Sequence, residues 1–233
     1  MNLADPQLST QLSTHLSVAE QNRNSVWDEN FFKLFSECEI GLLSVDPQQG
    51  PDSWPYLICE IITEKNKTQF DSERIDSSQK ILKWLSTKGI GLVVNPRREP
   101  YPDFVFSFGM IWSFMETGYF IRSDLALDQG QSSGEVDYSN QKIISGAPTE
   151  QFLPLYVRQT MKSFLNDQSV FNPRMLMISV DAKNYDLAFS LESLDNPPEK
   201  EHAGIAEALS WFLPPHYSVV LISETGLPAF TQL

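Results

Sequence analysis

The second half of this chain repeats the order of patterns in its first half, and this doubling constrains the fold more than any other feature. The sequence Leu-Ser-Val-Asp at residues 43–46 returns as Ile-Ser-Val-Asp at residues 178–181. A helical pattern around Trp84 returns around Trp211, and an apolar run follows a few residues later in both halves. Because the order helix, strand, strand, helix, strand can be read twice, the sequence predicts two related α+β units.

Turn and helix signals give the boundaries of these units. We expect an amphipathic helix in residues 1–25, a first α+β unit in residues 26–95 and a second in residues 149–233. An insertion with an aromatic and a polar part occupies residues 96–148. Two or three strands with one or two helices bury little apolar surface alone. The two sheets could therefore join edge to edge or stack through their helices, and we favour one mixed, mainly antiparallel sheet with helices on one face.

Hydrophobic periodicity predicts the individual elements. Helices are expected at residues 5–22, 26–39, 77–87, 149–165 and 199–212, and strands at residues 40–45, 54–63, 90–94, 174–180, 185–191 and 217–223. The first helix carries Leu8, Leu12 and Leu16 on a narrow stripe, which could pack on the body of the protein, pair with another chain or fray. We favour packing on the body.

The insertion is the part of the chain richest in aromatic residues. Phe104, Phe106 and Phe108 alternate with other residues, as in a half-buried strand. Residues 111–115 are expected to form the returning strand, with a helical turn as the alternative, and residues 119–121 a further strand. Residues 123–140 are polar and contain glycine, which predicts a mobile loop.

Composition restricts the partners that the protein can bind. The 233 residues carry a formal net charge of −13, which disfavours nucleic acids and anionic lipid because phosphates are repelled. The sequence contains no run of eighteen apolar residues and no secretory signal pattern at its N-terminus, so we expect neither membrane insertion nor export. Cys38 and Cys59 lie in apolar contexts and are expected to be buried free thiols. These features predict a cytoplasmic protein.

No motif for catalysis or cofactor binding stands out. The three histidines lack a second histidine or cysteine at metal-ligand spacing, so we expect no metal site. Neither a phosphate-binding loop nor a dinucleotide-binding turn occurs, and no cofactor is expected. Ser107 lacks the glycine that a nucleophile elbow has two residues before its serine. The sequence favours a function without catalysis.

The strongest binding signal is the segment at residues 95–103, which follows a predicted buried strand. Arg97 and Arg98 form the only adjacent basic pair in an acidic chain, and Tyr101 lies close by. Arginines at a strand end beside an aromatic ring can hold a carboxylate, a phosphate or an acidic peptide. Alternatively, the two arginines pair with Glu99, Asp103 or another acid and anchor the insertion.

The aromatic residues after this segment extend the predicted surface. We add Phe104 and Trp112 to Arg97, Arg98 and Tyr101 as the candidate binding residues. Core packing is the commoner role of such rings, and it is the alternative here.

The second unit resembles the C-terminal domain of the SseB (enhanced serine sensitivity) family of bacterial proteins. The likeness lies in a hairpin of residues 177–180 and 187–191, a following helix, the apolar strand at 219–222 and the short tail that ends near Phe230. It covers about a third of the chain and is one of element order and length. The resemblance implies a cytoplasmic bacterial protein of poorly defined role, without accepted catalytic residues.

Our leading hypothesis is a non-enzymatic protein that binds another protein or a peptide, such as an adaptor, a secretion chaperone or an immunity-type protein. The alternative is a small-molecule-binding protein or an enzyme with a pocket between the two units, near Arg97 and Tyr101. A regulatory domain that senses an amino acid is a third hypothesis, permitted by the family resemblance. A homo-oligomer is compatible with each of them.

Overall fold

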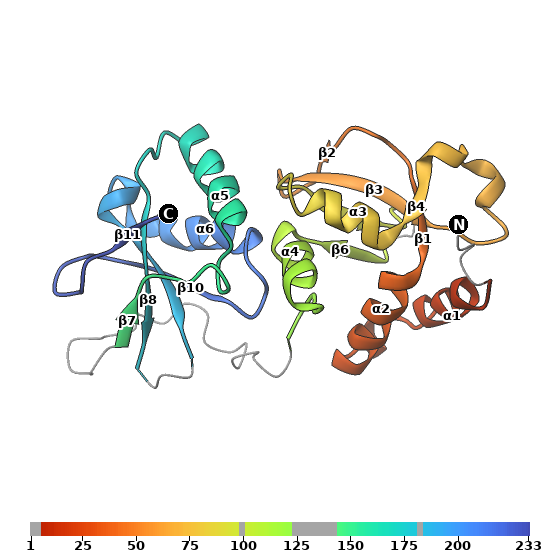
Figure 1. Cartoon of the computed structure of the whole chain (residues 1–233), viewed down its shortest axis with the longest axis horizontal. Helices are drawn as coiled ribbons and strands as arrows, with labels where there is room; N and C mark the ends of the chain where they lie inside the picture. Colours follow the sequence, from red (N-terminus) through yellow and green to blue (C-terminus); the bar gives the residue numbers. More distant parts are fainter. Residues whose placement is uncertain (1–5, 98–100, 123–143, 181–183) are drawn as a thin grey trace. The chain divides into compact units, whose positions relative to one another are not determined.

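The computed structural model describes residues 6–97, 101–122, 144–180 and 184–233. The chain divides into a first unit, Met1–Phe120, and a second unit, Ile121–Leu233. Each unit combines helices with its own mixed sheet (Figure 1), which confirms the expected α+β class. The predicted single sheet is wrong, because the described strands form two separate sheets. Most edge strands have only two or three residues, and such short edges offer little backbone for pairing between sheets.

The first unit begins with two helices, α1 (Pro6–Leu16) and α2 (Ser25–Glu37). The Asn24 side chain caps α2 by accepting a hydrogen bond from the Trp27 backbone N–H. Leu12 and Leu16 are almost fully buried, and α1 packs against α2. The expectation that the leucine stripe packs on the body of the protein is confirmed.

The first sheet follows these helices. Its strands and the helices between them are β1 (Glu39–Leu42), β2 (Gln48–Gln49), β3 (Pro55–Ile61), η2 (Lys67–Gln69), η3 (Ser72–Arg74), β4 (Ile75–Ser77), α3 (Ser78–Leu85), β5 (Gly91–Val94) and β6 (Phe104–Phe106). The strand order is β4-β1-β3-β5-β6, with β2 beside β3. Strands β1 and β3 are antiparallel, whereas β3 and β5 are parallel and joined through α3.

Residues 96–97 and 101–120 of the predicted insertion belong to the first unit, and its other described residues, 121–122 and 144–148, belong to the second. Strand β6 pairs with β5 and extends the sheet. Residues 111–115 lie in helix α4 (Phe108–Thr117), so the returning strand is wrong and the helical alternative holds. The Ser107 side chain accepts from Met110 N–H at the start of α4, and Gly118 ends it with a φ of 80°. Residues 119–121 form no strand.

A cluster of phenylalanines fills the core of the first unit. Phe106 is fully buried, and its ring centroid lies 4.9 Å from that of Phe35 on α2 and 4.7 Å from that of Phe120. Phe104 packs 4.9 Å from Phe31 in the same cluster. The aromatic residues of the predicted insertion thus join β6 and α4 to the helices at the N-terminus.

The second unit has the same order and pairing of its main elements. They are β7 (Ile144–Gly146), α5 (Leu155–Asp167), β8 (Arg174–Ser179), β9 (Asp186–Ser190), η5 (Glu192–Leu194), α6 (Glu199–Trp211), β10 (Ser218–Ile222) and β11 (Thr231–Gln232). Strands β8 and β9 are antiparallel, and β9 runs parallel to β10 through α6. The short strands β7 and β11 both pair with β8.

Residues 43–46 follow the end of β1, whereas Ile178 and Ser179 lie inside β8, so this match does not mark equivalent positions. The runs after Trp84 and Trp211 do correspond, since they form β5 and β10. Helix α5 starts at Leu155 rather than near Thr149, because the Thr149 hydroxyl accepts from Phe152 N–H in a turn before the helix.

Candidate functional site

One face of the first sheet carries a row of apolar side chains that are half-buried or exposed. Ile58 on β3 lies opposite Val93 on β5, and Val93 lies opposite Val105 on β6. Directly opposed residues of neighbouring strands share a face, so the three side chains stand side by side. Ile58 and Val93 are half-buried, and Val105 is 40% exposed. We call this surface the open face.

The helices pack against the opposite face of the sheet. Phe104 and Phe106 flank Val105 on β6 and point away from the open face, because side chains alternate along a strand. Their rings contact the aromatic residues of α2. Helix α3 contacts α2 and α4, and α4 contacts β5 and β6. Among the described residues, no helix of the first unit covers the row of Ile58, Val93 and Val105.

Two aromatic rings cover other parts of the open face. A Cβ atom at Gly91 would lie 2.5 Å from the Tyr56 ring, and one at Gly41 would lie 2.6 Å from the Phe70 ring. Both positions therefore need glycine, because the rings lie directly on the backbone. The Tyr56 hydroxyl donates to Asp52 Oδ2 at 2.6 Å, which fixes the first ring. The valine and isoleucine row is the part that these rings leave accessible.

A small polar hollow adjoins this row. Glu60 lies two residues after Ile58 on the same face, and Arg97 Nη1 is 3.6 Å from its Oε1 atom. The Arg97 side chain is 75% exposed, whereas that of Glu60 is 16% exposed. The hollow encloses about 120 Å³ and is lined by Leu42, Leu43, Glu60, Gln69, Phe70, Asp71, Arg74 and Arg97. Two arginines and two carboxylates at its walls suit a single charged side chain of a partner.

Hydrogen bonds of Asn95 and Asp103 hold the two ends of the segment that carries Arg97. Asn95 adopts a φ of 51° and accepts from Ile61 N–H through Oδ1, while its Nδ2 donates to Asp103 Oδ2 at 2.8 Å. Asp103 is buried and lies 3.6 Å from the Arg23 guanidinium. Arg23 also donates to the Asp103 carbonyl oxygen and stacks over Trp27 at 4.2 Å. Asn95 is therefore bonded to strand β3, and Asp103 to Arg23 in the connection between α1 and α2.

The structure separates the five residues that the sequence singled out. Arg97 and Tyr101 are exposed, and Arg98 lies outside the described residues. Phe104 is half-buried within the phenylalanine cluster. Trp112 is 1% exposed, so its assignment to a contact surface is wrong: it lies in the stretch of α4 in which every residue from Phe108 to Ser113 is buried.

Sequence reasoning missed Ile58, Val93, Val105 and Glu60. Each sits in a strand that was predicted, but their juxtaposition depends on β5 running parallel to β3 and antiparallel to β6. The exposed position of Val105 between Phe104 and Phe106 was the one local signal, because alternation places it on the other face.

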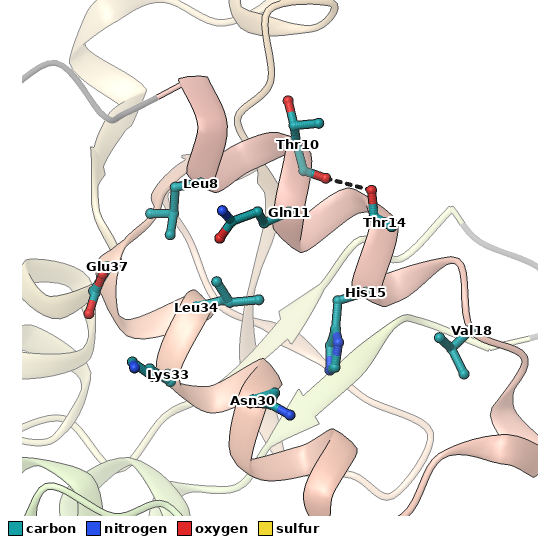
Figure 2. Close-up of a pocket in the computed structure, with 10 residues that line it drawn as sticks. All are labelled: Leu8, Thr10, Gln11, Thr14, His15, Val18, Asn30, Lys33, Leu34 and Glu37. Carbon is teal, nitrogen blue, oxygen red and sulfur yellow. Dashed lines mark hydrogen bonds between the residues drawn. The ribbon is translucent and has the colours of Figure 1, made fainter.

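A second, larger hollow lies between α1 and α2 (Figure 2). It measures about 650 Å³, is open to solvent and is lined by Leu8, Thr10, Gln11, Thr14, His15, Val18, Asn30, Lys33, Leu34 and Glu37. His15 serves structure here, since its ring stacks on Trp27 at 4.7 Å and its Nε2 lies 2.8 Å from the Trp27 carbonyl oxygen. The remaining lining combines the apolar Leu8, Val18 and Leu34 with polar and charged side chains.

The described residues do not assemble a reactive thiol or a metal centre. Cys38 and Cys59 are free and buried, and burial raises the pKa of Cys38 to about 12 and that of Cys59 well above its ordinary value. Both thiols stay protonated at neutral pH, so neither is an activated nucleophile. No group of three histidine, cysteine or acidic side chains is placed to hold a metal ion in the described part of the chain.

Comparison with protein families, with curated proteins and with solved structures gives no match to this chain. The resemblance of the second unit to the SseB family therefore stays a prediction. Within the described residues, no helix combines the length and the apolar character that crossing a membrane requires.

Proposed function

We propose that this chain is a non-enzymatic protein that binds a segment of another protein, and that the open face with the adjoining Arg97 hollow is its contact surface. A cytoplasmic location is part of the proposal. The free cysteines support it, because thiols persist in reducing compartments.

The observation that carries this proposal comes from the second unit. Leu176, Ala188 and Val220 lie opposite one another on β8, β9 and β10, in the place that corresponds to the open face. Phe230 packs against the cluster that contains Leu176 and Ala188, and both of these residues are almost fully buried, whereas Val220 is half-buried. The second unit thus covers Leu176 and Ala188 with its C-terminal segment, in which β11 pairs with β8.

The first unit has no such cover among its described residues. Ile58 and Val93 remain half-buried and Val105 exposed, although apolar side chains gain free energy when water is removed from them. A partner segment that lies across the row would supply the contact that Phe230 supplies in the second unit. Strand β6 is an edge strand of only three residues, so we expect side-chain contacts rather than backbone pairing to dominate the binding.

The dimensions of the site favour a peptide over a small molecule. Small-molecule pockets enclose about 300–1,000 Å³ and bury most of their ligand. The hollow at Arg97 has about 120 Å³, which suits one side chain. We therefore expect a partner segment with an apolar or aromatic residue over Val105 and an acidic residue near Arg97.

Selection of peptides from a displayed random library tests this function. Peptides that bind the wild-type protein should lose about tenfold or more in affinity when Val105→Asp or Arg97→Ala is introduced, since each variant removes a central contact. Fluorescence anisotropy with a labelled peptide measures the dissociation constant. Val26→Asp and Lys33→Ala are matched controls, because both residues are exposed on α2.

The controls should bind as the wild type does. The proposal fails if selection yields no peptide, or if the selected peptides bind Val105→Asp and Arg97→Ala as tightly as the wild-type protein.

A further inference from the structure

Helix α3 carries an exposed basic and aromatic stripe on the side away from the core. Leu82 and Leu85 are fully buried on its inner side. The stripe, which we call the α3 stripe, consists of Lys80, Lys83, Trp84, Thr87 and Lys88, all exposed. Their spacings of three and four residues place them on one helical side. Backbone hydrogen bonds from Thr87 to Trp84 and from Lys88 to Leu85 continue that geometry past the end of the helix.

Trp84 is the apolar centre of this stripe. It is 45% exposed, and the Lys88 ammonium lies 5.9 Å from its ring centroid. Trp211 holds the corresponding position at the end of α6 in the second unit, where it is 8% exposed. Exposed tryptophans beside cations are frequent anchors of protein interfaces, because they bring a large apolar area together with a polar tip.

The charge of the stripe is opposite to that of the molecule. The chain has a net charge of −13, but the stripe contains three lysines and no acid. Lys80 forms an ion pair with Asp76. Lys83 and Lys88 form no ion pair with any described residue, so both ammonium groups are available. The corresponding helix α6 carries acids at its start, Glu199 and Glu201, which sets the two helices apart.

We infer that the α3 stripe docks an acidic segment of a partner protein, with an apolar side chain of that segment on Trp84. The lysines would pair with its carboxylates at the rim of the contact. The site is separate from the open face, because α3 packs with α2 and α4 on the other side of the sheet. This inference does not depend on the proposed function.

A short acidic peptide fits this site better than a nucleic acid does. The acidic remainder of the protein repels a long polyanion, whose phosphates extend beyond the stripe. A short segment can stay within about 8 Å of the lysines, which is the screening length at physiological salt. Within that distance the local positive charge outweighs the distant negative charge.

Fluorescence anisotropy tests the inference with a labelled peptide of glutamates around a central leucine. The wild-type protein should bind this peptide, and binding should weaken as salt rises. The double variant Lys83→Glu with Lys88→Glu should lose about tenfold or more in affinity, and Trp84→Ala should lose a similar factor. The intrinsic tryptophan fluorescence of the wild-type protein should change when the peptide is added, whereas that of Trp84→Phe should not.

Matched controls distinguish a local effect of the α3 stripe from a general effect of the protein's net charge on peptide binding. The double variant Lys33→Glu with Lys200→Glu makes the same change in charge on exposed positions of α2 and α6, and should bind as the wild type does. Val105→Asp should also leave binding unchanged. Circular dichroism confirms that each variant is folded.

Three outcomes would overturn the inference: no binding of the glutamate and leucine peptide, an equal loss in the Lys33 and Lys200 control, or equally tight binding of a single-stranded oligonucleotide or an anionic vesicle. The first shows that the stripe is a solvated helix surface. The second shows a general charge effect, and the third a preference for phosphates.

Discussion

At the scale of single residues, Arg23 has the most consequential contacts of any side chain near the candidate site. Its guanidinium donates to the backbone carbonyl oxygens of Leu16, Val18 and Asp103, and lies 3.6 Å from the Asp103 carboxylate. One planar group thus joins the end of α1 to the segment that precedes β6. Sequence reasoning selected Arg97 and Arg98 because they are adjacent, and missed Arg23 because its charged partner, Asp103, lies 80 positions away in the sequence.

We predict that Arg23→Ala lowers the free energy of unfolding by about 2 kcal/mol or more, because it leaves the buried Asp103 carboxylate without its cation. Arg23→Lys should recover only part of this loss, since an ammonium cannot reproduce the guanidinium fork. Urea denaturation measures the difference. Lys33→Ala is the control, and an Arg23→Ala protein as stable as that control would contradict the role assigned to Arg23.

At the scale of elements, residues at the end of strand β9 and just after β9 and β10 link the two strands. The Ser223 hydroxyl and the Glu224 N–H donate to the Glu192 carboxylate, and the Ser190 hydroxyl donates to Glu224. Arg174 Nη2 lies 2.7 Å from Glu224 Oε1. The hydrogen bond from Ser223 is the main reason why the pKa of Glu192 lies below its usual value.

The lowered pKa of Glu192 predicts that the free energy of unfolding of the second unit depends on pH. A carboxyl whose pKa is lower in the folded state stabilises the fold above its ordinary pKa of 4.5, and this stabilisation is lost as the pH falls below that value. Ser223→Ala removes the main donor and should make the second unit less sensitive to pH between neutrality and about pH 3. Urea denaturation across this range measures the effect, and an unchanged pH profile would contradict it.

Element types were predictable where the local pattern was unambiguous. The amphipathic patterns of α2, α3 and α6 and the apolar runs of β5 and β10 gave the correct type. Helix α4 was mistaken for a strand because a short run that is apolar on all sides has no period. The Ser107 cap and Gly118 were the local signals for its ends.

At the scale of the whole molecule, each unit has its own hydrogen-bonded sheet and its own core. Leu187 on β9 and Leu92 on β5 are both fully buried, one in each unit. Truncating either leaves a cavity that destabilises the surrounding core. The separation of the sheets indicates that this loss is confined to the unit that contains the substitution.

We predict that Leu187→Ala destabilises the second unit by about 3 kcal/mol while the first unit keeps its stability. Native-state hydrogen exchange should show faster exchange in β8, β9 and β10, with unchanged protection in β3 and β5. Leu92→Ala should give the reverse pattern. Loss of protection in both sheets with either variant would show that the two units unfold together.

The type and order of most elements and the lack of recognisable catalytic motifs could be inferred from the sequence. These properties follow from local periodicity, caps and residue types, which neighbouring residues establish. Three properties could be seen only in the folded chain: Trp112 is buried, Val105 and Trp84 are exposed, and Ile58 lies opposite Val93. Which side chains meet and which stay in water depends on the pairing of distant strands and the helices that cover them, and no local pattern encodes that pairing.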